Sequence, residues 1–71
     1  MSELAQLLVD IVTNAGGTLT YPKVKELVPP QDWRRIPSAF KEARANGALD
    51  QRVVWDGSVN THSYFVPTGG A

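Results

Sequence analysis

The pattern of the sequence changes at Gly47 from helical spacing to strand-like composition. Before this glycine, apolar residues recur three and four positions apart, as they do along the buried side of an amphipathic helix. After it, β-branched and aromatic residues form two runs separated by a turn sequence. In a chain of 71 residues this order predicts one small α+β domain, in which helices pack against a terminal hairpin. We expect the domain to span residues 1–67 and residues 68–71 to form a flexible tail.

An apolar stripe predicts a first helix over residues 3–15. Ser2 is a suitable N-cap, because its hydroxyl can accept a hydrogen bond from a free amide of the first turn. Gly16 and Gly17 follow the stripe and supply the left-handed conformation that commonly ends a helix. The stripe consists of Leu4, Leu7, Leu8, Ile11, Val12 and Ala15.

A very short strand and a second helix are expected between residues 18 and 28. Residues 18–20 place one leucine between two β-branched threonines, which suits a strand. Thr20 can then cap the helix, and Pro22 falls in its first turn, where a missing amide proton does little harm. Pro29 and Pro30 stop the helix, since a residue before proline is pushed out of the helical conformation. The apolar stripe of this helix consists of Val24, Leu27 and Val28.

The third helix is expected to begin near Ile36. Pro37 in a helix interior would cost roughly 3 kcal/mol, so it belongs in the first turn. Residues 31–35 then form a separate turn or a 3₁₀ lead-in, and Gly47 ends the helix after Asn46. Helical spacing places four side chains on one face: Trp33, Ile36, Phe40 and Ala43. Trp33 is expected in the core or as a helix cap.

The last part of the chain predicts a hairpin. Residues 48–56 and 60–66 form the strands, and Asp56, Gly57 and Ser58 form the turn. The short strand at residues 18–20 is expected to pair with this hairpin. One small core follows, made of Leu4, Leu8, Ile11, Leu19, Val24, Leu27, Ile36, Phe40 and Leu49.

The stretch from residue 35 to residue 49 resembles the recognition helix and first wing strand of the winged helix-turn-helix superfamily. The matching positions are Ile36, Phe40, Ala43, Gly47 and Leu49. The globular domain of linker histones is similar in this stretch and in residues 63–66, although linker histones are strongly basic and this chain carries no net charge. The resemblance implies three helices and a two- to three-stranded antiparallel wing. It also implies that the third helix, residues 36–46, contacts bases in the major groove and that the wing reaches the backbone or the minor groove.

Basic residues are concentrated in the middle of the chain. All seven lysines and arginines lie between residues 23 and 52 with four carboxylates, which gives this stretch a net charge of +3. We therefore predict double-stranded DNA as the partner of a small, non-enzymatic regulator of transcription or DNA architecture. Asp32 and Glu42 repel phosphate, so a monomer should bind weakly and specific binding should need a dimer or tethering. The expected DNA contacts are Lys23, Arg34, Arg35, Ser38, Lys41, Arg44, Asn60 and His62.

A protein-interaction module is the alternative hypothesis. Winged helices also bind proteins, and zero net charge with Trp55 and Tyr64 near the wing favours that class. Such a chain could be a phage-encoded inhibitor of a host factor or a subunit domain of a larger complex, and a homodimer is also compatible with it. A continuous positive strip would favour DNA. Cations neutralised by Asp32 and Glu42, beside an exposed aromatic patch, would favour a protein partner.

Other classes of function find no support in the sequence. The chain has no cysteine and only His62 as an imidazole, so we expect no metal. No serine has a base nearby in sequence and no phosphate-binding glycine motif occurs, so we expect no enzyme, cofactor or small-molecule substrate. No apolar run approaches the roughly 18 residues of a membrane span. Because the N-terminus lacks the basic start of a signal peptide, we expect a cytoplasmic, nucleoid or nuclear protein that is not secreted.

Overall fold

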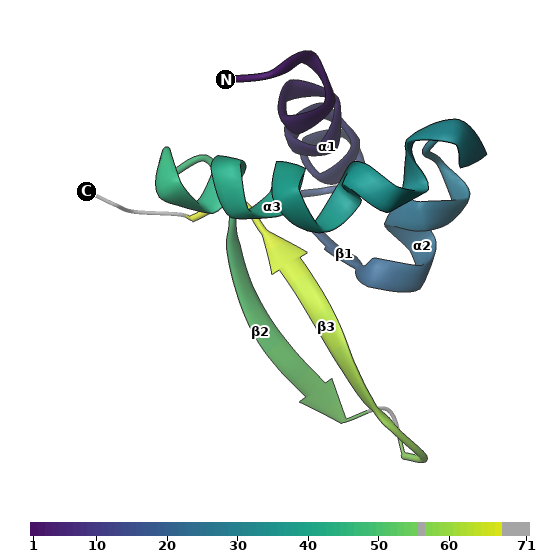
Figure 1. The fold of residues 1–71 in the computed structure, drawn as a ribbon. Helices are drawn as coiled ribbons and strands as arrows, with labels where there is room; N and C mark the ends of the chain where they lie inside the picture. Colours follow the sequence, from purple (N-terminus) through teal and green to yellow (C-terminus); the bar gives the residue numbers. More distant parts are fainter. Residues whose placement is uncertain (56, 68–71) are drawn as a thin grey trace.

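The computed structural model describes residues 1–55 and 57–67 (Figure 1). Within them the chain forms an α+β domain with three α-helices and a three-stranded antiparallel sheet in the order β1–β3–β2, as the sequence predicts at this level. Asp56 of the expected turn and the expected tail at residues 68–71 lie outside the described residues. The elements are α1 (Glu3–Asn14), β1 (Thr18–Thr20), α2 (Tyr21–Glu26), the 3₁₀ helix η1 (Pro30–Arg35), α3 (Ile36–Ala45), β2 (Asp50–Trp55) and β3 (Asn60–Phe65).

Helix α1 begins and ends as its sequence predicts. The Ser2 hydroxyl accepts a hydrogen bond from the amide of Ala5 at 3.2 Å, which satisfies one free donor of the first turn. Gly16 and Gly17 have φ angles of 97° and 95°, a conformation that strongly favours glycine. The amide of Gly17 donates to the carbonyl of Val12 at 3.0 Å, so the chain reverses directly into β1.

The junction between η1 and α3 also follows the local chemistry of the sequence. Helix α3 begins at Ile36 and Pro37 lies in its first turn, so the missing amide proton leaves no hydrogen bond unmade. The preceding residues adopt the predicted 3₁₀ conformation. After α3, Gly47 has a φ of 74° and turns the chain toward β2.

Helix α2 differs from its prediction in two respects. Thr20 is the N-cap residue, but its side chain makes no capping hydrogen bond. Leu27 was expected in the core and is 60% exposed, so this prediction is wrong. The helix ends at Glu26, which leaves Leu27 as a C-cap residue outside the stripe that packs on the core.

Trp33 caps the end of α2. Its indole N–H lies 2.9 Å from the carbonyl oxygen of Val28 and 3.1 Å from that of Lys25 and donates to both. These carbonyls lie at and just beyond the end of α2, where the regular hydrogen bonds of the helix stop. The ammonium of Lys25 lies 4.6 Å from the centre of the indole ring. Of the two predicted roles, the structure therefore supports the cap, and the ring remains partly exposed.

The core lies where α1 and α3 meet the base of the sheet. Phe40 of α3 stacks on Tyr64 of β3, with ring centres 3.5 Å apart and nearly parallel planes. Leu19 of β1 is the cross-strand partner of Tyr64, which joins the sheet to this stack. Leu19 and Ile11 are only half-buried at the margin. The buried apolar residues are Leu4, Ala5, Leu8, Val12, Val24, Val28, Ile36, Ala39, Phe40, Ala43, Leu49 and Tyr64. No helix among the described residues is long and apolar enough to cross a membrane.

Candidate nucleic-acid interface

Helix α3 separates the core from an open surface. Its buried side is formed by Ile36, Ala39, Phe40 and Ala43. On the opposite side Ser38, Lys41 and Ala45 are exposed, as the helical spacing predicts. Two of these three side chains are small, so a partner can approach the helix backbone closely. The β2–β3 hairpin extends away from the three helices (Figure 1) and supplies a second exposed element.

Four of the seven cations have partners among the described residues. Two form ion pairs and two lie over aromatic rings. The pairs are Lys23 with Glu26 at 3.8 Å, Arg35 with Asp32 at 2.5 Å, Lys25 over Trp33 and Arg52 over Phe65. Four of the seven cations between residues 23 and 52 are therefore already engaged within the chain and are less available to a partner.

The other three cations are Arg34, Lys41 and Arg44. All three side chains are exposed, and none of them makes an ion pair, hydrogen bond or ring contact within residues 1–55 and 57–67. They fall within eleven consecutive positions, at the end of η1 and along α3. The lysine and arginine side chains without a partner among the described residues are therefore concentrated at the end of η1 and along α3.

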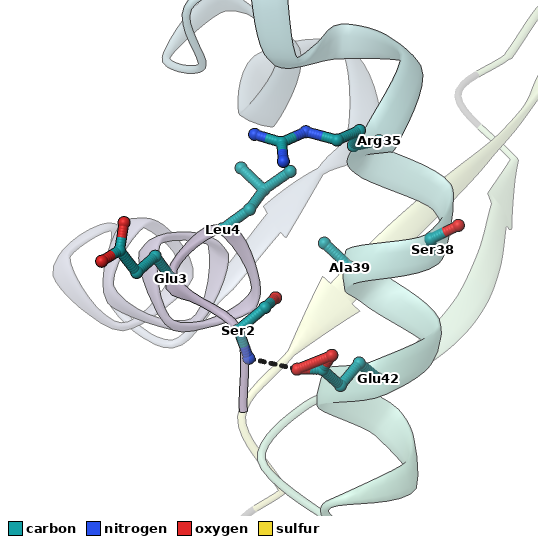
Figure 2. Close-up of a pocket in the computed structure, with 7 residues that line it drawn as sticks. All are labelled: Ser2, Glu3, Leu4, Arg35, Ser38, Ala39 and Glu42. Carbon is teal, nitrogen blue, oxygen red and sulfur yellow. Dashed lines mark hydrogen bonds between the residues drawn. The ribbon is translucent and has the colours of Figure 1, made fainter.

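The two carboxylates near this helix are turned to other partners. Asp32 accepts the hydrogen bond of Arg35. Glu42 is half-buried and accepts a hydrogen bond from the backbone amide of Ser2. Figure 2 shows Glu42 pointing toward the start of α1, while Ser38 points away from α1. Because the start of a helix carries partial positive charge, it compensates the charge of Glu42. The sequence placed both carboxylates on the positive face, and it could not reveal these partners.

A hollow of about 480 Å³ lies between the start of α1 and α3 (Figure 2). Arg35 of the expected DNA-contact set borders it together with Glu3 and Glu42. The guanidinium of Arg35 is thus tied to Asp32 beside two further carboxylates, and this side of α3 is a poor surface for phosphate. The complete lining is Ser2, Glu3, Leu4, Arg35, Ser38, Ala39 and Glu42.

A second hollow, of about 310 Å³, joins α3 to the hairpin. It is lined by Tyr21, Pro37, Gln51, His62 and Tyr64. Gln51 Nε2 lies 2.6 Å from His62 Nδ1 in a hydrogen bond across the strands. The structure therefore brings His62 of the expected set to the first turn of α3. The contribution of Gln51 was missed because no local pattern shows which residue of β2 lies beside His62.

Asn60 lies farther along the hairpin than His62. It begins β3 and is the cross-strand partner of Trp55. Directly opposite residues of antiparallel strands project to the same face, so Asn60 and His62 share a face with Gln51 and Tyr64. Lys23 lies apart from these residues on α2 and is paired with Glu26 in an exposed ion pair.

The two aromatic residues expected at a protein interface have different environments. Trp55 is 63% exposed, which agrees with that use. Tyr64 is only 7% exposed and stacks on Phe40, so its expected role as a surface aromatic is wrong. Burial raises the pKa of the Tyr64 hydroxyl, and the positive charge of Arg44 opposes the rise. Phe65, the next residue of β3, projects to the other face and is half-buried.

No group of three or more histidine or acidic side chains suited to a metal ion occurs among the described residues. Comparison of the chain with protein-family models, with curated proteins and with solved structures gives no match.

Proposed function

We propose that this chain is a winged-helix domain that binds duplex DNA with α3 and the β2–β3 hairpin, as a small regulator of transcription or DNA architecture. The observation that carries the proposal is the concentration of unpaired cations at α3. The side chains of Arg34, Lys41 and Arg44 make no ion pair, hydrogen bond or ring contact among the described residues, while Asp32 and Glu42 are engaged elsewhere. Phosphate oxygens are the partners that such a row of exposed cations favours.

The dimensions and order of the elements support the same proposal. Helix α3 has ten residues, and an α-helix with its side chains is roughly 10–12 Å across. The major groove of DNA is about 12 Å wide and admits one α-helix. The order helix, short strand, helix, helix and hairpin is that of a winged helix, and the hairpin corresponds to the wing. His62 and Asn60 on one face of the wing are hydrogen-bonding groups for phosphate or bases.

Lys23 and Arg35 are expected to contribute less to DNA binding than the unpaired cations do. The exposed pair between Lys23 and Glu26 contributes at most about 1 kcal/mol, so phosphate can replace Glu26 as the partner. Arg35 is held by Asp32 at 2.5 Å and contributes less than the other arginines. The balance of charges predicts weak binding by a monomer.

A protein partner is the second candidate function, and the exposure of Trp55 favours it. Tryptophan is enriched at the centres of protein interfaces. This candidate predicts a surface whose cations are neutralised, and among residues 1–55 and 57–67 only Arg35 is such a cation beside α3. The two candidates differ most clearly in the effect of salt on binding to DNA.

The salt dependence of binding to random duplex DNA tests the proposal. With three phosphate contacts, counterion release predicts that log K falls with log salt at a slope of about −2.7. Raising salt from about 50 to about 200 mM then weakens binding roughly 40-fold. Fluorescence anisotropy of a labelled duplex measures this slope. Absence of binding at low salt, or a slope near zero, would contradict the proposal and favour a protein partner.

A further inference from the structure

The wing carries an exposed apolar stripe on one face. In the register of the hairpin, Gln51 pairs with Tyr64, Val53 with His62 and Trp55 with Asn60. These six side chains project to the same face, because directly opposite residues of an antiparallel pair do so. At the base this face is buried through Tyr64, and farther out it is open: Val53 is 58% exposed and Trp55 63%.

Trp55 is not held by other groups of the described chain. Its indole makes no hydrogen bond and no ring contact with residues 1–55 or 57–67, in contrast to Trp33, whose indole caps α2. The side chain therefore contributes nothing to the core, and its ring is available to a partner. Tryptophan is enriched among the residues that dominate binding at interfaces.

The charges around the stripe indicate the nature of that partner. None of the described side chains on this face of the wing is acidic, while Asp50 and Arg52 project to the opposite face. The hollow that contains His62 and Gln51 also contains Pro37 of α3, so this face and α3 border the same space. Lys41 and Arg44 follow Pro37 by four and seven positions and so lie on the same side of α3. Val53 and Trp55 continue the hairpin face of Gln51 outward. An anionic partner with an apolar interior complements cations and apolar side chains placed in this way.

We propose that Trp55, supported by Val53, inserts between base pairs of the duplex held by α3 and bends it. This inference rests on the proposed DNA binding. A duplex offers phosphates to Lys41 and Arg44 and stacked bases to an indole ring. Proteins that insert apolar side chains at a base step unstack it and bend the duplex by roughly 20–90°. A wing that projects from the helices can reach such a step beside the groove that α3 occupies (Figure 1).

The test compares binding and bending in the full chain and in Trp55→Ala. Energy transfer between dyes at the two ends of a short duplex reports bending, and anisotropy reports binding. The wild-type chain increases the transfer. Trp55→Ala still binds, about tenfold more weakly because a stacked base contact is lost, and leaves the transfer at the value of free DNA. Trp55→Phe retains a stacking ring and part of the bend.

Leu27→Ala is the matched control. Leu27 is 60% exposed and Trp55 63%, but Leu27 lies at the end of α2, away from the hairpin. This variant should bind and bend DNA as the wild type does. Circular dichroism verifies that both variants fold, which is expected because neither side chain belongs to the core.

Three results would overturn the proposal. Equal bending by Trp55→Ala and the wild type would exclude insertion. Trp55-dependent self-association of the free chain in sedimentation, with bending unchanged in Trp55→Ala, would assign the stripe to contacts between copies. Failure of the wild-type chain to bind any duplex at low salt would overturn the DNA proposal as a whole. Failure of the insertion proposal alone is distinguishable from that result, because the wild type and Trp55→Ala then both bind and bend DNA equally while Lys41→Glu still binds more weakly than the wild type.

Discussion

Lys41→Glu weakens the binding of duplex DNA about 100-fold at roughly 50 mM salt, because it reduces three effective phosphate contacts to one. Lys41 is exposed on α3 and has no partner among the described residues, so the substitution removes no interaction of the folded chain. The free energy of unfolding should therefore change by less than about 0.5 kcal/mol. Anisotropy titrations measure the binding, and thermal unfolding followed by circular dichroism measures the stability.

Arg52→Glu is the matched control for this prediction. It makes the same change in net charge, but Arg52 projects to the opposite face of the sheet, over Phe65. Its effect on affinity should be several-fold smaller than that of Lys41→Glu, since only long-range charge is altered. Equal losses in the two variants would mean that net charge alone governs binding and would remove α3 from the interface. Unchanged binding in Lys41→Glu would remove it as well.

Phe40→Ala should unfold most of the chain at moderate temperature. Phe40 is almost completely buried and contacts Tyr64 at 3.5 Å and Tyr21 at 6.4 Å between ring centres. Removing a buried phenyl group costs about 3–5 kcal/mol. Domains of this size are stabilised by little more than that, since folding free energies are roughly 5–15 kcal/mol and small chains bury the least surface.

Urea unfolding followed by circular dichroism measures this loss. Phe40→Leu keeps most of the apolar volume and should cost less than about 2 kcal/mol. Leu27→Ala, at an exposed position, should change the free energy of unfolding by less than about 0.5 kcal/mol. A loss below about 1 kcal/mol in Phe40→Ala would show that the Phe40–Tyr64 stack is not the centre of the core.

The features that the sequence predicts well are those that depend on neighbouring residues. Pro37 fixes the start of α3 because its ring excludes an interior position. Ser2 caps α1 through an amide only three residues away. The left-handed glycine at position 47 follows α3 directly. Each of these features depends on the backbone chemistry of residues close together in the chain, and the sequence alone specifies those neighbours.

The features that the sequence does not reveal depend on contacts between distant segments. The side of β3 that is buried depends on its register with β1 and β2, and so Tyr64 enters the core while Phe65 stays at the margin. Glu42 is engaged by the amide of Ser2, forty positions away. Leu27 fits an apolar spacing, but α2 ends before it can turn that side chain inward. The structure therefore defines the candidate interface better than the sequence does. Asp32 and Glu42 are engaged by other groups. The cations that remain unpaired among the described residues are Arg34, Lys41 and Arg44.

The most direct test is a titration of the isotopically labelled chain with random duplex DNA, followed through the amide chemical shifts at low and then at moderate salt. The proposal predicts shifts concentrated in residues 34–45 and in the hairpin between residues 53 and 62, which diminish as salt is raised. Shifts centred instead on α1 or on the outer sheet face around Arg52 would place the binding surface elsewhere. No shifts at low salt would contradict DNA binding and direct the search to a protein partner at Trp55.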